Sequence, residues 1–442
     1  MQASDFLKII GQFSSENGKD FRQFHKNGAF FSRATLEIGG NLCYTDAKWE
    51  RGYGMAKRWI GGLFAVGVLT ALLLCGLRMY LRPLDINYYE NRKAEQPEPL
   101  TAQSYLSGSF QNAMEKALAD QIPYSSYGKK LYNLAYSGFT DTLLQRLVQT
   151  MPERYIPYRT GLQIFGGDTL TFYTRKLETE QPKLLRYAQA LNSLAERLPQ
   201  AQFYVYYIEK DTDIFFDSGI KVGAYEALAE RLSVPHDVFR IDSFAEFRRD
   251  FYRTDHHWNY SGSYRAYRQL LALLGSEGEP LLPQGEAVCV GEFSGSKAAQ
   301  AGTTIFHEPF FAYRFNFPDY RVLRNGAQAQ DYGAQGDYLN GKKTGGVNYG
   351  MFYGTDDGEV RICSGTEGRG KILLLGESFD NALLKLLAAH YDELFAVDLR
   401  NYAAQMGESF HLAEYLTRNG IDRVLFIGNI DYFVSADFLT EY

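Results

Sequence analysis

Cysteine is scarce in this sequence: four occur in 442 residues, and no two of them form a C-x-x-C pair. A small disulfide-stapled scaffold and a cysteine-based zinc site are therefore excluded. Cys289 and Cys363 lie in the second half of the chain. In an oxidising compartment these two either pair or remain as two separate buried thiols, and both options stay open.

An excess of basic residues is also absent, because 46 Lys and Arg stand against 52 Asp and Glu and give a net charge of -6. Neutralising phosphates takes a concentrated basic face, so we expect no nucleic-acid partner. Internal repeats and low-complexity tracts are missing too. With 45% hydrophobic and 22% charged residues, the chain has the composition of a globular protein rather than a disordered one.

Charges are missing from one long run, Trp59–Leu77, which reads WIGGLFAVGVLTALLLCGL. About 20 apolar residues span a bilayer core, so the run predicts a single transmembrane helix. No lipoprotein site or A-x-A cleavage site accompanies it, and we expect the anchor to be retained. Basic residues flank it equally. However, Met55 before Ala-Lys-Arg has the layout of a signal anchor, which places the C-terminal part outside the cytoplasm, at the cell membrane.

The rest of the chain divides around this run. Residues 1–58 are predicted as a cytoplasmic tail or as an upstream extension that is not normally made. Residues 78–101 are polar, contain several prolines and are predicted as a linker. Residues 102–442 form the extracytoplasmic domain, in which 285–366, rich in glycine and aromatic residues, are predicted as a β-containing insertion.

Short, almost uniformly apolar strands alternate with helices in residues 102–442. The predicted strands are Gln202–Ile208, Lys371–Leu375, Glu393–Val397 and Arg423–Ile427. Such strands are typical of a parallel sheet covered on both faces, so we predict an α/β fold with a doubly wound, mostly parallel sheet. The predicted helices are Ser109–Leu118, Leu131–Leu147, Glu178–Leu198, Ala224–Leu232, Ser263–Leu274, Asp380–His390 and Ser409–Asn419.

Aromatic residues are unusually frequent, at 15% of the chain. They either fill a bulky core or line a cleft for sugars. One group falls in the predicted insertion, where lining of a glycan groove is an open alternative to core packing: Phe306, Phe310, Phe311, Tyr313, Phe315, Phe317 and Tyr320.

Two short motifs carry residues suited to nucleophilic catalysis. Ser378, in Gly-Glu-Ser-Phe, directly follows the strand Lys371–Leu375, and ligands of α/β sheets bind beyond the carboxyl ends of the strands. It is either a nucleophile or an N-cap of the next helix. Asp255 and His257 share one loop in Asp-x-His spacing, which supplies a base and its orienting carboxylate. The alternatives are a metal site without a clear third ligand or an aspartate that caps a helix.

The tetrapeptide Asp255-His256-His257-Trp258, together with Ser378 in Gly-Glu-Ser-Phe, resembles the bacterial DHHW proteins. These are similar to the periplasmic alginate O-acetylation proteins, which carry an SGNH-hydrolase-like domain. The likeness extends from Ser109 to the C-terminus and includes Asp120-Gln121-Ile122-Pro123 and Asp398-Leu399-Arg400. The order Asp, His, Ser matches the alginate-type branch and is reversed from ordinary SGNH esterases, and Glu377 stands where SGNH enzymes usually have aspartate.

The resemblance implies Ser378 as the nucleophile, His257 as the base and Asp255 as its orienting partner. No metal or other cofactor is expected. The further implied site residues are Asn429 and Gly376 at the oxyanion and Trp258 and Arg400 at the substrate.

The function implied is that of a membrane-anchored, extracytoplasmic O-acyltransferase, acetyl being the expected acyl group, which acts on a cell-envelope or secreted polysaccharide. An integral-membrane acyltransferase is the implied partner that supplies acyl groups. Two alternatives remain: a carbohydrate esterase that uses water in the same site, and a non-catalytic polysaccharide-binding or assembly protein.

Overall fold

The computed structural model describes the chain from Gly62 to Ser435, except for residues 75, 80, 82–85, 88–91, 145, 160, 303–304, 366 and most of 122–142. Two compact units are present, Met1–Arg82 and Pro83–Tyr442. In the first, the helix Gly62–Met79 is long and apolar enough to cross a membrane, with a mean hydropathy of 2.0. The predictions for residues 1–58, for the start of the run at Trp59 and for most of the helix Leu131–Leu147 lie outside the described residues.

The second unit begins with a two-stranded sheet and two helices. These are β1 (Ile86–Asn87), β2 (Arg92–Lys93), α3 (Ala102–Ser107) and α4 (Ser109–Gln121). Part of the predicted linker is bound to α4, because Asp120 Oδ2 accepts a hydrogen bond from the Glu95 N–H at 2.9 Å and Gln121 Nε2 donates to the Glu95 carbonyl at 3.1 Å. The Asp120-Gln121 pair therefore holds the segment before α3 against the end of α4.

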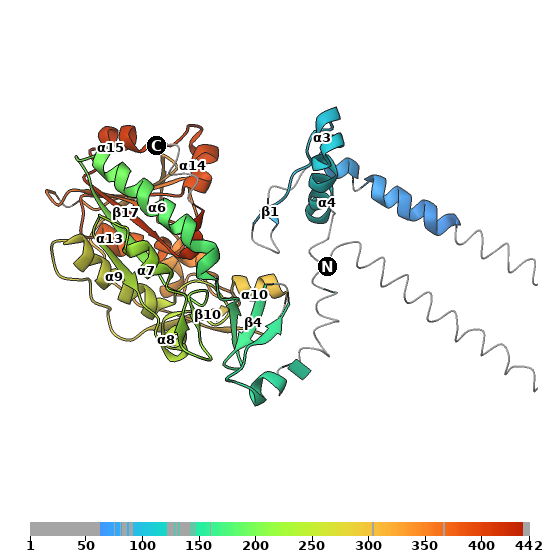
Figure 1. The fold of residues 1–442 in the computed structure, drawn as a ribbon, viewed down its shortest axis with the longest axis horizontal. Helices are drawn as coiled ribbons and strands as arrows, with labels where there is room; N and C mark the ends of the chain where they lie inside the picture. The colour runs from blue at the N-terminus through green and yellow to red at the C-terminus, as the bar shows by residue number, and fades with distance from the viewer. Residues whose placement is uncertain are drawn as a thin grey trace, which may run out of the picture. The chain divides into compact units, whose positions relative to one another are not determined.

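A mixed sheet that contains β17 forms the centre of the unit (Figure 1). Its eight strands stand in the order β13-β12-β14-β16-β15-β17-β6-β9. The five strands from β16 to β9 are parallel, and β14, β12 and β13 extend the sheet in antiparallel pairs. The strands are β6 (Gln202–Ile208), β9 (His236–Phe239), β12 (Arg321–Arg324), β13 (Ala327–Ala329), β14 (Glu359–Cys363), β15 (Lys371–Leu375), β16 (Glu393–Val397) and β17 (Arg423–Gly428).

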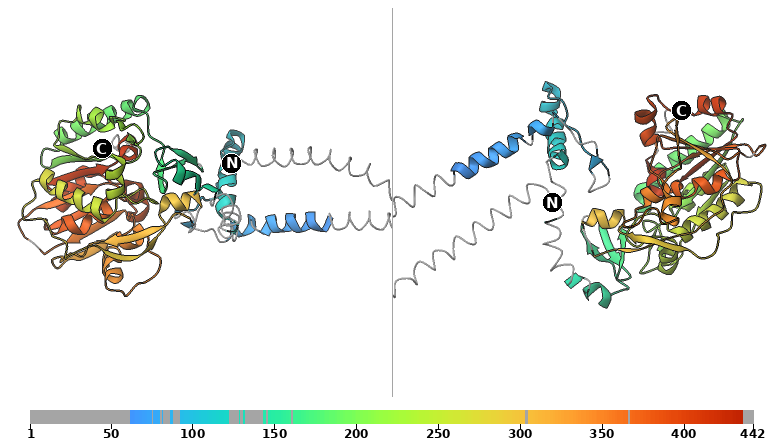
Figure 2. Two further views of the ribbon diagram at one scale, coloured as in Figure 1. Left: turned by 90° about the horizontal axis from the view of Figure 1, so that it is seen from below. Right: turned by 180° about the vertical axis from the view of Figure 1, so that it is seen from behind.

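Both faces of this sheet are buried under helices, which explains why its central parallel strands are apolar after their first residue. In β15, Ile372 and Leu374 join one apolar cluster, while Leu373 and Leu375 join the other. The second face is covered by α6 (Leu177–Arg197), α7 (Ala224–Ala229), α14 (Leu399–Met406), α15 (Leu412–Asn419) and α16 (Ile430–Val434). The first is covered by α8 (Phe244–Asp250), α9 (Tyr260–Leu274), α11 (Gln335–Leu339), α12 (Tyr349–Tyr353) and α13 (Leu384–Ala388) (Figure 2).

A smaller three-stranded sheet lies beside the main one, next to α10 (Ser296–Ala301). Its strands are β3 (Ile156–Tyr158), β4 (Leu162–Phe165) and β5 (Thr169–Phe172). Leu162, Ile164 and Leu170 pack there against Ala298 and Phe306. Two further hairpins are β7 (Ile214–Phe215) with β8 (Ile220–Lys221) and β10 (Val288–Phe293) with β11 (Glu308–Ala312).

The segment 285–366, predicted as one insertion, is divided between two places. β10 and β11 form their own hairpin, but β12, β13 and β14 belong to the main sheet. Its aromatic rings are divided as well. Phe306 and Phe310 are buried in the cores, whereas Tyr313, Phe315 and Phe317 are half-buried and line a small hollow with Tyr260 and Tyr264.

The two downstream cysteines are free. Cys289 is exposed on β10 and Cys363 is partly buried at the end of β14, so neither the disulfide nor the pair of buried thiols is found. The predicted helix Asp380–His390 is also different: a 3-10 turn, Asp380–Ala382, precedes the short α13.

Candidate active site

Ser378 lies in a tight turn between β15 and the 3-10 turn Asp380–Ala382, and its side chain is half-buried. The turn starts at Gly376, where the chain leaves the sheet beside β17. A Cβ on Gly376 would lie 2.6 Å from Asp380 Oδ2 and 2.8 Å from Ile427 Cγ2, so glycine is the residue that this close approach allows. The turn therefore presents the serine hydroxyl at the carboxyl end of the parallel strands.

Asp255 and His257 come from the loop that connects α8 to α9, which is closed at its base by backbone pairing. Phe251 and Trp258 form an isolated β-bridge, and the Asn259 N–H donates to the Asp250 carbonyl at 2.8 Å. Asn259 then caps α9, because its Oδ1 accepts from the N–H groups of Ser261 and Gly262. This cap starts α9 three residues before the predicted helix start.

These three side chains form one chain of hydrogen bonds. Asp255 Oδ1 lies 2.6 Å from His257 Nδ1, and His257 Nε2 lies 2.6 Å from Ser378 Oγ. Asp255 and His257 are buried, with exposed fractions of 3% and 6%. A serine, an imidazole and a carboxylate in this order are the parts that general-base activation of a hydroxyl requires.

The His257 ring is held on a second side by Tyr349 of α12. The two rings are parallel within 2°, with centroids 3.8 Å apart. Phe379, the residue after the serine, contacts His257 at a centroid distance of 5.1 Å. Packing on two sides fixes the plane of the imidazole, and the bond to Asp255 fixes its rotation within that plane.

Asp255 carries its negative charge inside the protein. Burial alone would raise the pKa of this carboxyl, but the neighbouring His257 and His256 and the Ser296 N–H hold the pKa well below its ordinary value. The Ser296 N–H donates to Asp255 Oδ2 at 2.6 Å, and the His257 N–H donates to Oδ1 at 2.9 Å. Asp255 therefore stays ionised at neutral pH, as a partner of a protonated imidazole must.

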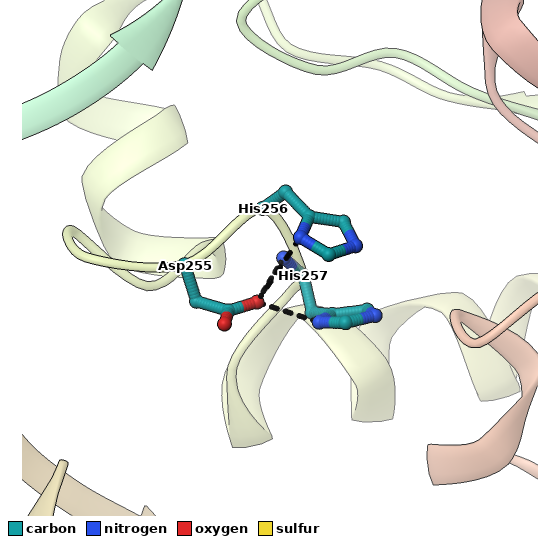
Figure 3. A group of neighbouring side chains, drawn as sticks. All are labelled: Asp255, His256 and His257. Atoms are coloured by element: carbon teal, nitrogen blue, oxygen red, sulfur yellow. Dashed lines mark hydrogen bonds and ion pairs between the residues drawn. The ribbon is translucent and has the colours of Figure 1, made fainter. Parts of the chain in front are cut away.

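Asp255, His256 and His257 lie close enough to be tested as metal ligands (Figure 3). Two ligands of a tetrahedral zinc ion lie about 3.3 Å apart, given metal–ligand bonds near 2.0–2.1 Å. Asp255 Oδ1 and His257 Nδ1 are 2.6 Å apart, which is a hydrogen-bond length and leaves no space for an ion between them. Asp255 Oδ1 and His257 Nδ1 therefore share a proton and are too close together to bind one ion jointly.

Asn429 follows β17 at the same edge of the sheet. β15 and β17 pair in parallel with Leu375 opposite Phe426, and Ser378 and Asn429 each follow three residues later in the chain, beyond the strand ends. Asn429 is buried, and its Oδ1 caps α16 by accepting from the Asp431 N–H at 2.8 Å. Because the cap uses the amide oxygen, the Nδ2 group is the part of this side chain that can donate to an oxyanion.

The predicted substrate contact at Trp258 is wrong. Its side chain is fully buried and packs against Phe239 and Phe379, with ring centroids 5.6 and 5.3 Å away. Trp258 therefore packs inside the core against Phe379, the residue after Ser378, and a substrate cannot reach it. The composition of the motif did not separate a binding aromatic from a core aromatic.

Arg400, in contrast, is half-exposed and lines a hollow next to Glu377, at the carboxyl edge of the sheet. Its guanidinium contacts Asp398 at 2.6 Å, Asp356 at 3.0 Å and Glu377 at 3.2 Å. Burial alone would lower the pKa of Arg400, but these carboxylates raise it, so the group stays charged. The same contact occupies Glu377, the residue that departs from the usual SGNH aspartate.

Residues that sequence reasoning missed hold the loop in place. Thr254 Oγ1 donates to Glu308 Oε1 at 2.7 Å and accepts from the Gly295 N–H at 3.0 Å. Glu308 also accepts from the Thr254 and Arg253 N–H groups. The available signal was a buried glutamate at the start of the apolar strand Glu308–Ala312, since such a charge needs partners.

The comparisons with known proteins agree with the motif. Residues 238–397 match the family model described as DHHW protein. The chain is similar to a solved DHHW family protein from Eubacterium siraeum, with 17% identity, a TM-score of 0.47, and coverage of 63% of this chain and 94% of that chain. PatB1 of Bacillus cereus has 17% identity, a TM-score of 0.48, and coverage of 63% and 97%. The O-acetyltransferase domain of AlgJ from Pseudomonas putida has 12% identity, a TM-score of 0.37, and coverage of 64% and 96%.

No curated protein sequence matches the chain. The matched stretch 238–397 contains Asp255, His257 and Ser378 and ends with β16. The resemblance to the DHHW proteins, predicted from Asp255-His256-His257-Trp258 and the later serine, is thereby confirmed.

Proposed function

We propose that this protein is a membrane-anchored, extracytoplasmic O-acyltransferase that transfers acetyl groups to a cell-envelope or secreted polysaccharide. The observation that carries the proposal is the hydrogen-bonded chain Asp255–His257–Ser378, with its hydroxyl at the carboxyl edge of the sheet. The resemblance to DHHW proteins supports the acetyl group and the polysaccharide. The helix Gly62–Met79 supports the anchor through its length and composition.

The reaction has two halves that use the same three groups. Ser378 Oγ attacks the acyl carbon of the donor while its proton passes to His257 Nε2, and Asp255 stabilises the imidazolium through Nδ1–H. The bond from the acyl carbon to the donor's leaving group then breaks, and His257 returns the proton to that group. A sugar hydroxyl next gives its proton to His257 and attacks the acyl-serine, so that the sugar ester forms and Ser378 regains its hydrogen.

The hollow beside Glu377 is where we place the acceptor. Gly376, Arg400, Tyr432 and Ser435 are among its lining residues, and it encloses about 990 Å³ with open solvent included. Arg400 is the cation among the described lining residues, and three carboxylates already occupy it. An anionic sugar would meet those carboxylates without a free cation, so we propose an uncharged acceptor glycan.

A carbohydrate esterase is the second candidate, favoured by the openness of this hollow to solvent. Water that enters it would hydrolyse the acyl-serine, whereas a bound sugar hydroxyl would capture the acyl group. Measuring the two products from one acylated enzyme, with and without neutral oligosaccharide, separates these activities. Acetylated oligosaccharide at the expense of free acetate supports the transferase.

The direct test uses a serine-directed sulfonyl fluoride and the full chain in detergent. Intact mass and peptide mapping should find one adduct, at Ser378, in the wild type, and none in Ser378→Ala or His257→Ala. A control with the same change at a serine outside the chain of hydrogen bonds, Ser294→Ala, should label like the wild type. Survival of both acetyl transfer and esterase activity in Ser378→Ala would overturn Ser378 as the nucleophile, and absence of both activities in the wild type would leave a non-catalytic binding protein. A reporter that is active only in the cytoplasm, fused after Tyr442, should give no signal.

A further inference from the structure

The loop offers Asp255 two imidazoles, and only one of them contacts Ser378. Figure 3 shows His256 and His257 on the same side of the carboxylate, with their ring centroids 3.8 Å apart. His257 Nδ1 lies 2.6 Å from Asp255 Oδ1, and His256 Nδ1 lies 3.6 Å from the same oxygen. Because one oxygen faces both Nδ1 atoms, something must decide which ring takes its hydrogen bond.

Ser296, the first residue of α10, contacts both His256 and the carboxylate of Asp255. Its Oγ lies 2.6 Å from His256 Nδ1, and its backbone N–H donates to Asp255 Oδ2 at 2.6 Å. The start of α10 approaches Asp255 so closely that only glycine fits before Ser296: a Cβ on Gly295 would lie 2.4 Å from Asp255 Cβ and 2.6 Å from Asp255 Oδ2. Ser296 is exposed, so its hydroxyl does not fill a core position, and the bond to His256 is its specific contact.

The geometry points to Ser296 as a positioning residue whose hydroxyl donates to His256 Nδ1 and thereby reserves Asp255 Oδ1 for His257. The inference rests on the proposed function, because it concerns the base of that reaction. A neutral imidazole carries one N–H, so accepting at Nδ1 places the His256 proton on Nε2, away from the carboxylate. His256 then has no hydrogen to offer Asp255, and His257 keeps the short bond.

The charges around His256 also favour its neutral form. His257, Lys210 and Lys297 disfavour a cation on this ring, and Asp255 is the group that favours one. Burial and the neighbouring His257 lower the pKa of His256 well below its ordinary value. When His257 takes the proton of Ser378, a neutral His256 beside it avoids two positive rings 3.8 Å apart.

The change Ser296→Ala removes the hydroxyl and keeps the backbone N–H on Asp255. The freed His256 Nδ1 can then take a proton and turn it toward Asp255 Oδ1. Since this proton is now stabilised by the carboxylate, the pKa of His256 should rise. The acid limb of the pH profile of kcat/KM should then also move to higher pH, because a charged His256 takes the hydrogen bond of Asp255 Oδ1 away from His257. KM should stay near the wild-type value, since Ser296 lines no part of the acceptor hollow.

Three variants separate this role from a merely structural one. Ser296→Thr keeps a hydroxyl and should keep the wild-type profile. The double variant Ser296→Ala/His256→Asn cannot be protonated at position 256, so its acid limb should return to the wild-type position. Ser294→Ala, whose hydroxyl bonds to the Phe306 carbonyl instead, is the matched control and should change neither quantity.

NMR of labelled imidazoles follows the His256 titration without any need for activity, and the chain has only seven histidines. An unchanged His256 pKa in Ser296→Ala would overturn the inference, as would an acid-limb change that persists in the double variant. A covalent adduct on Ser296 in the wild type would also overturn it, because Ser296 would then be a nucleophile. Failure of the proposed function shows separately, as absence of labelling at Ser378.

Discussion

Replacing Asp255 by asparagine changes one atom of the site and should nearly abolish acylation. In the native site, Oδ1 accepts from His257 Nδ1 at 2.6 Å and from the His257 N–H at 2.9 Å, while Oδ2 accepts from the Ser296 N–H at 2.6 Å. Both carboxylate oxygens therefore face donors. An amide has one accepting oxygen and one donating nitrogen, so one end of the new side chain would meet the wrong partner.

Either orientation of that amide is unfavourable, but in different ways. If the amide nitrogen faces His257, Nδ1 must accept, the ring proton moves to Nε2, and Nε2 can no longer take the proton of Ser378. If the amide oxygen faces His257, the nitrogen meets the Ser296 N–H, and a buried donor without an acceptor costs about 1–3 kcal/mol. The wrong tautomer in a serine triad lowers kcat on the order of 10⁴-fold, which corresponds to about 5.5 kcal/mol of activation free energy.

The assay is the burst of nitrophenol released when 4-nitrophenyl acetate acylates the enzyme, followed over time at saturating ester. Asp422→Asn is the matched control, because Asp422 precedes β17 and therefore lies at the opposite edge of the sheet. That variant should acylate at the wild-type rate. A folded Asp255→Asn protein that acylates within tenfold of the wild type would refute the assignment of Asp255 as the partner of the base.

Three further outcomes follow from buried groups near the site. Asp380→Asn should stabilise the protein by about 1–3 kcal/mol in urea unfolding at pH 8, because burial first and then the charges of neighbouring carboxylates raise the pKa of Asp380 well above its ordinary value. A raised folded-state pKa makes the ionised carboxyl destabilising above it, so this gain should vanish below about pH 4, and an equal gain at pH 3 would contradict the reasoning. Trp258→Phe should lower Tm and leave KM for oligosaccharide unchanged, since the indole is fully buried; a raised KM without loss of stability would restore a binding role. Lys297→Met should lower the free energy of unfolding by about 3–5 kcal/mol, because it removes the ammonium that lies 2.6 Å from Asp211 Oδ2 and leaves that buried carboxylate without its ion-pair partner. Adding Asp211→Leu should recover part of this loss. No recovery in the double variant would show that the ion pair is not the cause.

The parallel part of the sheet could be predicted well because burial on two faces leaves a simple pattern. The ranges predicted for β6, β15 and β16 coincide with the observed strands, and β17 is one residue longer. The antiparallel extension could not be predicted in the same way. β14 alternates between half-buried and buried residues, and such a strand can lie at many sheet edges. Its partner β16 is specified by packing that joins distant segments.

In the candidate site too, some features could be predicted from the sequence and others could not. Asp255, His257 and Ser378 were identified by residue type and position, and the structure brings them together, although their roles remain predictions. Helix starts and the 3-10 turn after the serine were missed because caps depend on backbone geometry: Asn259 begins α9 earlier than apolar spacing suggests. Trp258 was misassigned because an aromatic residue reads the same in a core as in a groove.

The groups that donate hydrogen bonds to the Asp255 carboxylate cannot be recognised from a sequence motif, for a physical reason. Asp255 receives three N–H donors, and two of them are backbone groups, of His257 and Ser296. Every residue except proline offers such a donor, so its identity carries no signal, and only the fold decides which one arrives. The one trace in the sequence is Gly295, which has no Cβ to keep α10 away from Asp255. A motif of the form Asp-x-His therefore specifies the base only together with the glycine that lets α10 approach it from about 40 residues further along the chain, and a search for similar sites should require that glycine.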